Sequence, residues 1–222
     1  MHPSRDARQR PSWPLAAALL LAALCLGGCS ALVAQNPGLA LTPVNAVADG
    51  SDERVMLKGY DVVAYFTQGQ HRLGQAQIKS VFEGVTFRFA TAEHKALFDA
   101  GPARYLPQYG GYCANGMVYG IPWGGDGDTW LIADGKLYIN GGAGSKAAFL
   151  LDVPGNIRLA DKYWAEEVRG SNSFVQRARR LVLRVPHYKS GGELEQMVRQ
   201  AAAKPGGFPS RRAVRDSPAR AG

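Results

Sequence analysis

Hydrophobic and polar residues alternate most clearly between residues 85 and 89. Val85, Phe87 and Phe89 are apolar, and Thr86 and Arg88 stand between them. A repeat of two residues places alternate side chains on opposite faces of a strand. We therefore predict a half-buried strand here, with its polar residues facing water.

Three helices are predicted after this strand, each from a polar residue that can cap a first turn. The caps are Thr91, Ser145 and Asn156, and their helices begin at residues 92, 146 and 157. Gly101-Pro102 ends the first helix. In the last one, helical spacing places four apolar residues on a single face: Ile157, Ala160, Trp164 and Val168.

A hairpin is predicted around Asp134-Gly135, which separates two apolar runs, 130–133 and 136–139. An Asp-Gly pair favours the two-residue turn that joins antiparallel strands. Strands and helices are thus mixed without regular alternation. This favours a small α+β single domain with a short antiparallel sheet and packed helices.

The N-terminus has the pattern of a targeting segment. Three arginines precede an uncharged apolar run, 15–26, which ends in Leu26-Gly27-Gly28-Cys29. The run is too short to cross a hydrocarbon core of about 30 Å comfortably. Small residues before a cysteine resemble the lipobox of bacterial lipoproteins, so residues 1–29 are predicted to be a signal peptide, with Cys29 as the lipidated residue. The alternative is a plain secretory signal with an incidental cysteine.

The lipobox implies an exported protein held by a lipid anchor in a bacterial membrane. Ser30, rather than an aspartate, follows Cys29, and by resemblance to lipoprotein sorting this indicates the outer membrane, with the protein facing the periplasm. Residues 30–53 contain Pro37 and Pro43 and are predicted to be a linker. We expect no structure of its own in the leader or the linker.

Charge divides the rest of the chain into two parts. Residues 54–168 form the predicted domain, which lies in a mildly acidic stretch, whereas residues 169–222 carry 12 basic and 3 acidic residues. We predict that this basic tail is partly helical, over Glu193–Ala203, and partly disordered. Near a membrane it would attract anionic lipid or an acidic envelope polymer. The alternative is a solvated extension without a partner. Nucleic acid is not expected as a partner, because the protein is predicted to be exported.

Five separated motifs within residues 54–168 resemble bacterial YHS-domain proteins. They are Lys58-Gly-Tyr-Asp-Val-Val-Ala-Tyr-Phe66, Phe87-Arg-Phe-Ala-Thr-Ala-Glu-His94, Pro102-Ala-Arg-Tyr-Leu-Pro-Gln-Tyr-Gly-Gly-Tyr-Cys113-Ala, Asp134-Gly-Lys-Leu-Tyr138 and Asp152-Val-Pro-Gly-Asn156. The wider group often binds metal through cysteines, but this chain has Ala64 and Ala90 at two such places. Some members of this branch carry selenocysteine, and matching it to Cys113 implies redox or soft-metal chemistry there.

Cys113 is the one cysteine left after residue 29, and an unpaired thiol in an oxidising compartment needs an explanation. It is our candidate catalytic residue and the candidate ligand of an exchangeable soft metal ion. Gly110 and Gly111 would open access to it. The alternative is a half-buried packing residue among Tyr105, Tyr109 and Tyr112.

The candidate binding residues around this thiol come from the family motifs: Tyr60, Asp61, His94, Tyr109, Gly110, Gly111 and Tyr112. Each also has a structural interpretation. Asp61 suits a turn or a cap, and His94, near a helix start, is more often a solvated surface group.

Two functions follow from these residues. The first is a non-catalytic binding module for a small ligand, a soft metal ion or a protein partner, acting through the Tyr109–Cys113 region. The second is a thiol-dependent redox protein that uses Cys113. Without a Cys-x-x-Cys pair or a resolving cysteine, the second function requires an external thiol or a partner protein as reductant.

Overall fold

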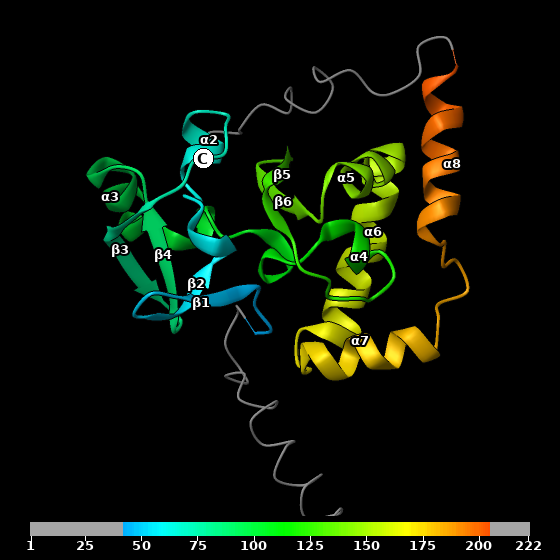
Figure 1. Cartoon of the computed structure of the whole chain (residues 1–222), viewed down its shortest axis with the longest axis horizontal. Helices are drawn as coiled ribbons and strands as arrows, with labels where there is room; N and C mark the ends of the chain where they lie inside the picture. The colour runs from blue at the N-terminus through cyan, green and yellow to red at the C-terminus, as the bar shows by residue number, and fades with distance from the viewer. Residues whose placement is uncertain (1–41, 205–222) are drawn as a thin grey trace, which may run out of the picture. The chain divides into compact units, whose positions relative to one another are not determined.

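A computed structural model describes residues 42–204 of the chain (Figure 1). The predicted signal peptide, the lipidation site Cys29, the first part of the linker and the end of the basic tail lie outside these residues. Residues 42–204 belong to one compact unit of the chain. None of the helices between residues 42 and 204 has the length and apolar character needed to cross a bilayer.

The described residues form six strands in two sheets. The larger sheet contains β1 (Ala46–Asp49), β2 (Asp52–Met56), β3 (Gln75–Phe82) and β4 (Val85–Phe89). The smaller one is a hairpin of β5 (Asp126–Ala133) and β6 (Lys136–Asn140).

Helices and short helical turns connect and cover these strands. The α-helices are α2 (Ala64–Thr67), α3 (Ala92–Ala100), α4 (Ala114–Met117), α5 (Ala143–Phe149), α6 (Val153–Tyr163), α7 (Ser173–Val182) and α8 (Gly191–Ala202). The shorter turns are 3-10 helical at Leu57–Gly59, Pro102–Arg104, Gln108–Gly111 and Leu150–Asp152, and π-helical at Trp164–Val168. The prediction of a single small domain that mixes helices and strands is confirmed.

The expectation of a purely antiparallel sheet is wrong for one strand pair. The strand order is β1-β2-β4-β3, and β2 runs parallel to β4 while the other neighbours are antiparallel. The predicted linker also proves too long, because β1 lies inside it and forms one edge of the sheet.

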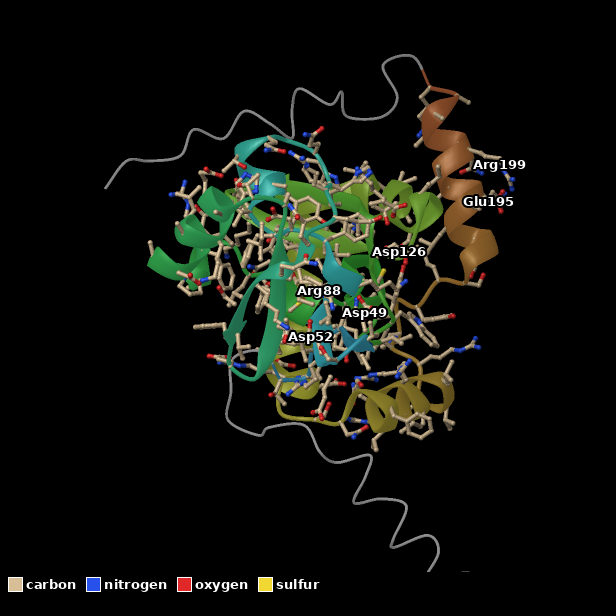
Figure 2. The ribbon with its side chains drawn as sticks, turned by 60° about the vertical axis from the view of Figure 1, so that its left-hand side comes forward. Asp49, Asp52, Arg88, Asp126, Glu195 and Arg199 are labelled. Carbon is tan, nitrogen blue, oxygen red and sulfur yellow. The ribbon has the colours of Figure 1, made fainter. Side chains whose placement is uncertain are left out.

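Strand β4 is buried on both faces, not on one as predicted. Thr86 and Arg88 are buried as well as the three apolar residues, and β4 lies between β2 and β3 in the sheet. Asp49 and Asp52 hold the buried Arg88 guanidinium (Figure 2). Its charge is satisfied by carboxylates that the pattern within β4 cannot reveal.

The hairpin turn is confirmed, and one of the three predicted caps is correct. Asp134 and Gly135 both have positive φ angles, as the Asp-Gly turn requires. The Thr91 side chain accepts from the His94 amide and caps α3.

The other two caps were placed wrongly. Helix α5 begins at Ala143 without a side-chain cap, and Asp152, not Asn156, caps α6. Ser145 and Asn156 lie inside these helices, and the Asn156 amide donates to the Phe149 carbonyl. Both residues therefore serve tertiary contacts instead of helix starts.

Part of the predicted basic tail is packed against the body. Ser173, Gln176 and Arg180 are buried, and the Gln176 amide donates to the Gly120 carbonyl at 3.1 Å. The predicted helix at 193–203 is confirmed as α8, which begins two residues earlier because Ser190 and Glu193 form a capping box.

Glu167 anchors α7 to the body, because its carboxylate accepts hydrogen bonds from Arg180 and Gln176. Burial acts to raise the pKa of Glu167. The hydrogen bonds from Arg180 and Gln176 outweigh this effect, so the pKa lies below its usual value. Such a carboxyl stabilises the fold above its unfolded pKa of about 4.3, and the contribution is lost as pH falls through the folded pKa.

We therefore expect the stability difference between wild type and Glu167→Gln to stay constant from pH 7 to about 5 and to shrink below about 4.3. Urea unfolding across this range measures it. Glu166→Gln, at the exposed neighbour, is the control. A difference that does not change with pH would contradict this role of Glu167.

Candidate functional site

Cys113 lies at a pocket of about 260 Å³ between α4, α5 and the start of α8. The pocket is lined by residues from several distant parts of the chain: Cys113, Asn115, Gly116, Tyr119, Ile121, Trp123, Gly124, Gly141, Ser145, Tyr188, Lys189, Gly191 and Leu194. None of these lining residues is acidic. The pocket thus combines one thiol, one lysine and several aromatic rings.

The backbone around Cys113 is held by two neighbouring segments. Its amide donates to the Trp123 carbonyl at 2.9 Å, and it forms a single parallel bridge with Ile139 of β6. The residue then begins α4. This double attachment places the sulfur at the junction of the loop, the hairpin and two helices.

Two polar groups contact the sulfur. The Gly116 amide donates to Sγ at 3.3 Å, and the Ser145 hydroxyl oxygen lies 3.0 Å from Sγ. Cys113 is only 4% exposed, so a reagent must enter through the pocket to reach it. The amide and the hydroxyl can both donate a hydrogen bond to the sulfur.

Glycines make this arrangement possible. A Cβ atom on Gly141 would lie 3.0 Å from the Gly124 carbonyl oxygen, and one on Gly116 would lie 2.7 Å from the Ile121 carbonyl oxygen. Larger residues would narrow the pocket or push its walls apart. These glycines are the sequence signal for the site, although their meaning appears only when the walls are known.

Tyr119 contributes a neutral phenol to the pocket wall. Burial, together with the neighbouring Tyr188 and Glu193, raises the pKa of Tyr119 to about 12. Its hydroxyl therefore keeps its proton at physiological pH and can donate a hydrogen bond.

Gly110 and Gly111 do not line the Cys113 pocket. Both have positive φ angles, and a Cβ on Gly110 would lie 2.3 Å from the Pro43 carbonyl oxygen. The Gly110 carbonyl accepts from the Asn45 amide, and the Asn45 side chain donates to the Gly111 carbonyl. These glycines let the segment before β1 cross closely over the loop.

Tyr109 and Tyr112 are structural residues whose hydroxyls bind other parts of the chain. The Tyr109 hydroxyl donates to Asp161, and the Tyr112 hydroxyl donates to the Val44 carbonyl. Burial raises the pKa of both phenols, and for Tyr109 the Asp161 carboxylate adds to this effect. Neither ring lines the pocket.

Asp61 and His94 form a second buried group, which does not line the Cys113 pocket. Asp61 Oδ2 lies 2.6 Å from His94 Nδ1 and accepts from the Ala90 amide. Its other oxygen accepts from the amides of Val63 and Ala64. The expectation that His94 is solvated is therefore wrong, because α3 turns this side chain toward the buried carboxylate.

Tyr60 also lies apart from the thiol pocket. Its ring packs against Gly127, where a Cβ atom would come within 2.3 Å of it, and it meets the His71 ring edge-on. The structure thus separates the predicted site residues. Cys113 lies at a pocket. The other predicted site residues do not line this pocket and make structural contacts elsewhere in the fold: Tyr60, Asp61, His94, Tyr109, Gly110, Gly111 and Tyr112.

Asn140 is an unusual polar residue beside this pocket. It is fully buried, and its side-chain amide nitrogen and oxygen have no hydrogen-bond partner in the described part of the chain. A buried amide without a partner costs about 1–3 kcal/mol. Asn140 directly precedes Gly141 of the pocket wall in the sequence, but its side chain does not line the pocket.

The described residues contain no cluster of three His, Cys, Asp or Glu side chains that could hold a metal ion. The contacts at Cys113 are instead a hydroxyl and a backbone amide. Comparison of the chain with protein-family models, with curated proteins and with solved structures found no match.

Proposed function

We propose that this chain is an envelope lipoprotein whose YHS-like domain is a non-catalytic binding module, with the Cys113 pocket as its binding site. The observation that carries the proposal is a pocket that combines the sole thiol after residue 29 with Lys189 and no acidic residue. The proposed family is supported by the five sequence motifs. The proposed location at the membrane is supported by the lipobox that ends at Cys29.

The lining residues indicate the class of ligand. Tyr119, Tyr188 and Trp123 offer aromatic surface, while Lys189 supplies a positive charge. Asn115 and Ser145 add polar groups that can orient a ligand. We infer a small organic anion with an apolar part, held beside the thiol.

Two alkylating reagents of similar size test this inference, since iodoacetate is an anion and iodoacetamide is neutral. In a fragment of residues 36–222, Cys113 is the one cysteine. We expect Lys189→Gln to lower the ratio of the iodoacetate rate to the iodoacetamide rate about threefold, because a nearby cation attracts the anion. Rates are normalised to those of N-acetylcysteine amide.

Lys136→Gln is the matched control, because Lys136 is an exposed lysine on β6 that does not line the pocket. It should leave the ratio unchanged. If Cys113 reacts with neither reagent until the protein is denatured, the pocket does not admit solutes and the proposal fails. If the ratio of the iodoacetate rate to the iodoacetamide rate is the same in wild type and Lys189→Gln, the inference that the pocket prefers anions is wrong.

The contacts at Cys113 Sγ also favour a second function, thiol-dependent redox chemistry. Hydrogen peroxide would oxidise the thiol to a sulfenic acid and release water, and an external thiol would then reduce it. Trapping with dimedone distinguishes the two functions. The redox function requires rapid labelling that Ser145→Ala slows, whereas a binding site requires neither.

A further inference from the structure

Helix α7 is packed with its polar face inward. Its buried side chains are Ser173, Gln176 and Arg180, and they meet the body through hydrogen bonds and an ion pair with Glu167. In most surface helices the buried face is apolar. The docking of α7 therefore leaves its hydrophobic residues without a core to enter.

The apolar face of α7 points to solvent. Phe174 and Val175 are each 56% exposed, Leu181 is 54% exposed and Val182 is 81% exposed. At 3.6 residues per turn these four side chains and Ala178 share one stripe along the helix. A contiguous exposed stripe of this kind marks an interaction surface more often than an isolated exposed residue does.

Arginines border this stripe on both edges. Arg177 and Arg179 flank Ala178, the centre of the stripe, so each lies about 100° around the helix from it. The Arg177 guanidinium lies 6.0 Å from the ring of Trp123, which is itself 41% exposed. Beyond the helix, Arg184 follows the exposed Leu183.

We propose that the outer face of α7 docks on an anionic lipid surface, with its apolar stripe in the interface and its arginines at the level of the phosphates. Helices that lie in a membrane interface have this arrangement, and long cationic side chains at their edges reach back to the headgroups. This surface is distinct from the Cys113 pocket, and the inference does not depend on the function proposed for that pocket.

Charge favours lipid over a second copy of the chain. Residues 168–192 contain six basic residues and no acidic one. The nearby Glu167 is bound by Arg180 and also lies 3.7 Å from the Arg179 guanidinium, which leaves the remaining arginines to contact phosphates. A two-fold dimer through the stripe would bring the arginines of both copies together. A bilayer that contains anionic lipid offers apolar depth and negative charge at once.

Vesicle co-sedimentation of the 36–222 fragment tests this surface without the predicted lipid anchor. Vesicles of phosphatidylcholine with about one third phosphatidylglycerol should bind it more tightly than pure phosphatidylcholine, and more weakly as salt rises. We expect the double variant Phe174→Ser/Leu181→Ser to lose at least tenfold in affinity, because it removes two large apolar side chains from the interface. Arg179→Gln should lose about fivefold on anionic vesicles only.

Val81→Ser/Leu97→Ser is the matched control, because these exposed apolar residues lie on β3 and α3. It should bind as wild type does. Unfolding of all variants is followed by circular dichroism. The substitutions Phe174→Ser and Leu181→Ser face outward on α7 and should leave the unfolding midpoint unchanged.

Results of two kinds would overturn the inference. One is a wild-type fragment that does not bind anionic vesicles, or a Phe174→Ser/Leu181→Ser variant that binds them as well as wild type does. The other is sedimentation that detects a stable dimer dispersed by these same substitutions, since a second copy would then cover the stripe.

Discussion

Replacing Asp61 with alanine is expected to lower the free energy of unfolding by about 3–5 kcal/mol. Asp61 is fully buried, and its carboxylate accepts from three backbone amides and from His94. Alanine would remove the side-chain acceptor of the Val63 and Ala90 amides and of His94, while the Ala64 amide keeps its bond to the main-chain carbonyl of residue 61. Burying donors without their acceptor is more costly than the loss of the hydrogen bonds alone. Urea unfolding measures the change.

Asp99→Ala is the matched control for this experiment. Asp99 also accepts from two side chains, Lys95 and Ser80, but its side chain is 43% exposed. Water can replace its partners, so we expect a loss below about 1 kcal/mol. If Asp61→Ala costs no more than Asp99→Ala, the buried carboxylate does not organise the junction of α2, β4 and α3.

Gly110→Ala is expected to destabilise the fold by about 3 kcal/mol through two effects. A non-glycine residue at its φ of +60° costs about 1–2 kcal/mol. In addition, the new Cβ would lie 2.3 Å from the Pro43 carbonyl oxygen, so the segment before β1 must move. The shift would weaken the hydrogen bond from the Asn45 amide.

Two control substitutions separate these effects. Gly135 has a φ of +70° with nothing within 4 Å of its would-be Cβ, so Gly135→Ala reports the backbone strain alone. Gly144 lies inside α5 with open space around it, and Gly144→Ala should stabilise by about 0.5–1 kcal/mol. In urea unfolding we expect Gly110→Ala to be the least stable of the three variants, Gly135→Ala to be intermediate and Gly144→Ala to be the most stable.

The same series distinguishes a structural Gly110 from one that opens access to Cys113. If Gly110→Ala slows alkylation of Cys113 without loss of stability, the interpretation from the sequence is right. If it lowers stability and leaves the alkylation rate of the folded protein unchanged, the glycine shapes the crossing of two segments.

Local patterns predicted the features that depend on a few neighbouring residues. The Asp134-Gly135 turn, the Thr91 cap and the helix near residues 193–203 are confirmed, because a turn or a cap is decided by the backbone within about four residues. The caps at Ser145 and Asn156 were wrong because both side chains bind groups in other elements.

Contacts between distant segments decided the rest. The alternation in 85–89 predicted a half-exposed strand, but all five residues of β4 are buried, and Asp49 of β1 and Asp52 of β2 neutralise Arg88. His94 looked like a surface residue until the fold placed Asp61 beside it. Burial depends on which strands meet, and spacing within a strand does not contain that information.

By itself, the sequence determined the mixed α/β class, the lone thiol after residue 29 and the cationic character of residues 169–222. Only the tertiary structure showed that Ser145 and Lys189 line a pocket with Cys113, and that α7 turns its apolar face outward. Composition and local propensity act within a few residues. The site arises instead from segments up to 81 residues apart, such as Cys113 and Leu194, that the fold brings together, and the exposed stripe arises from the way α7 docks on the body.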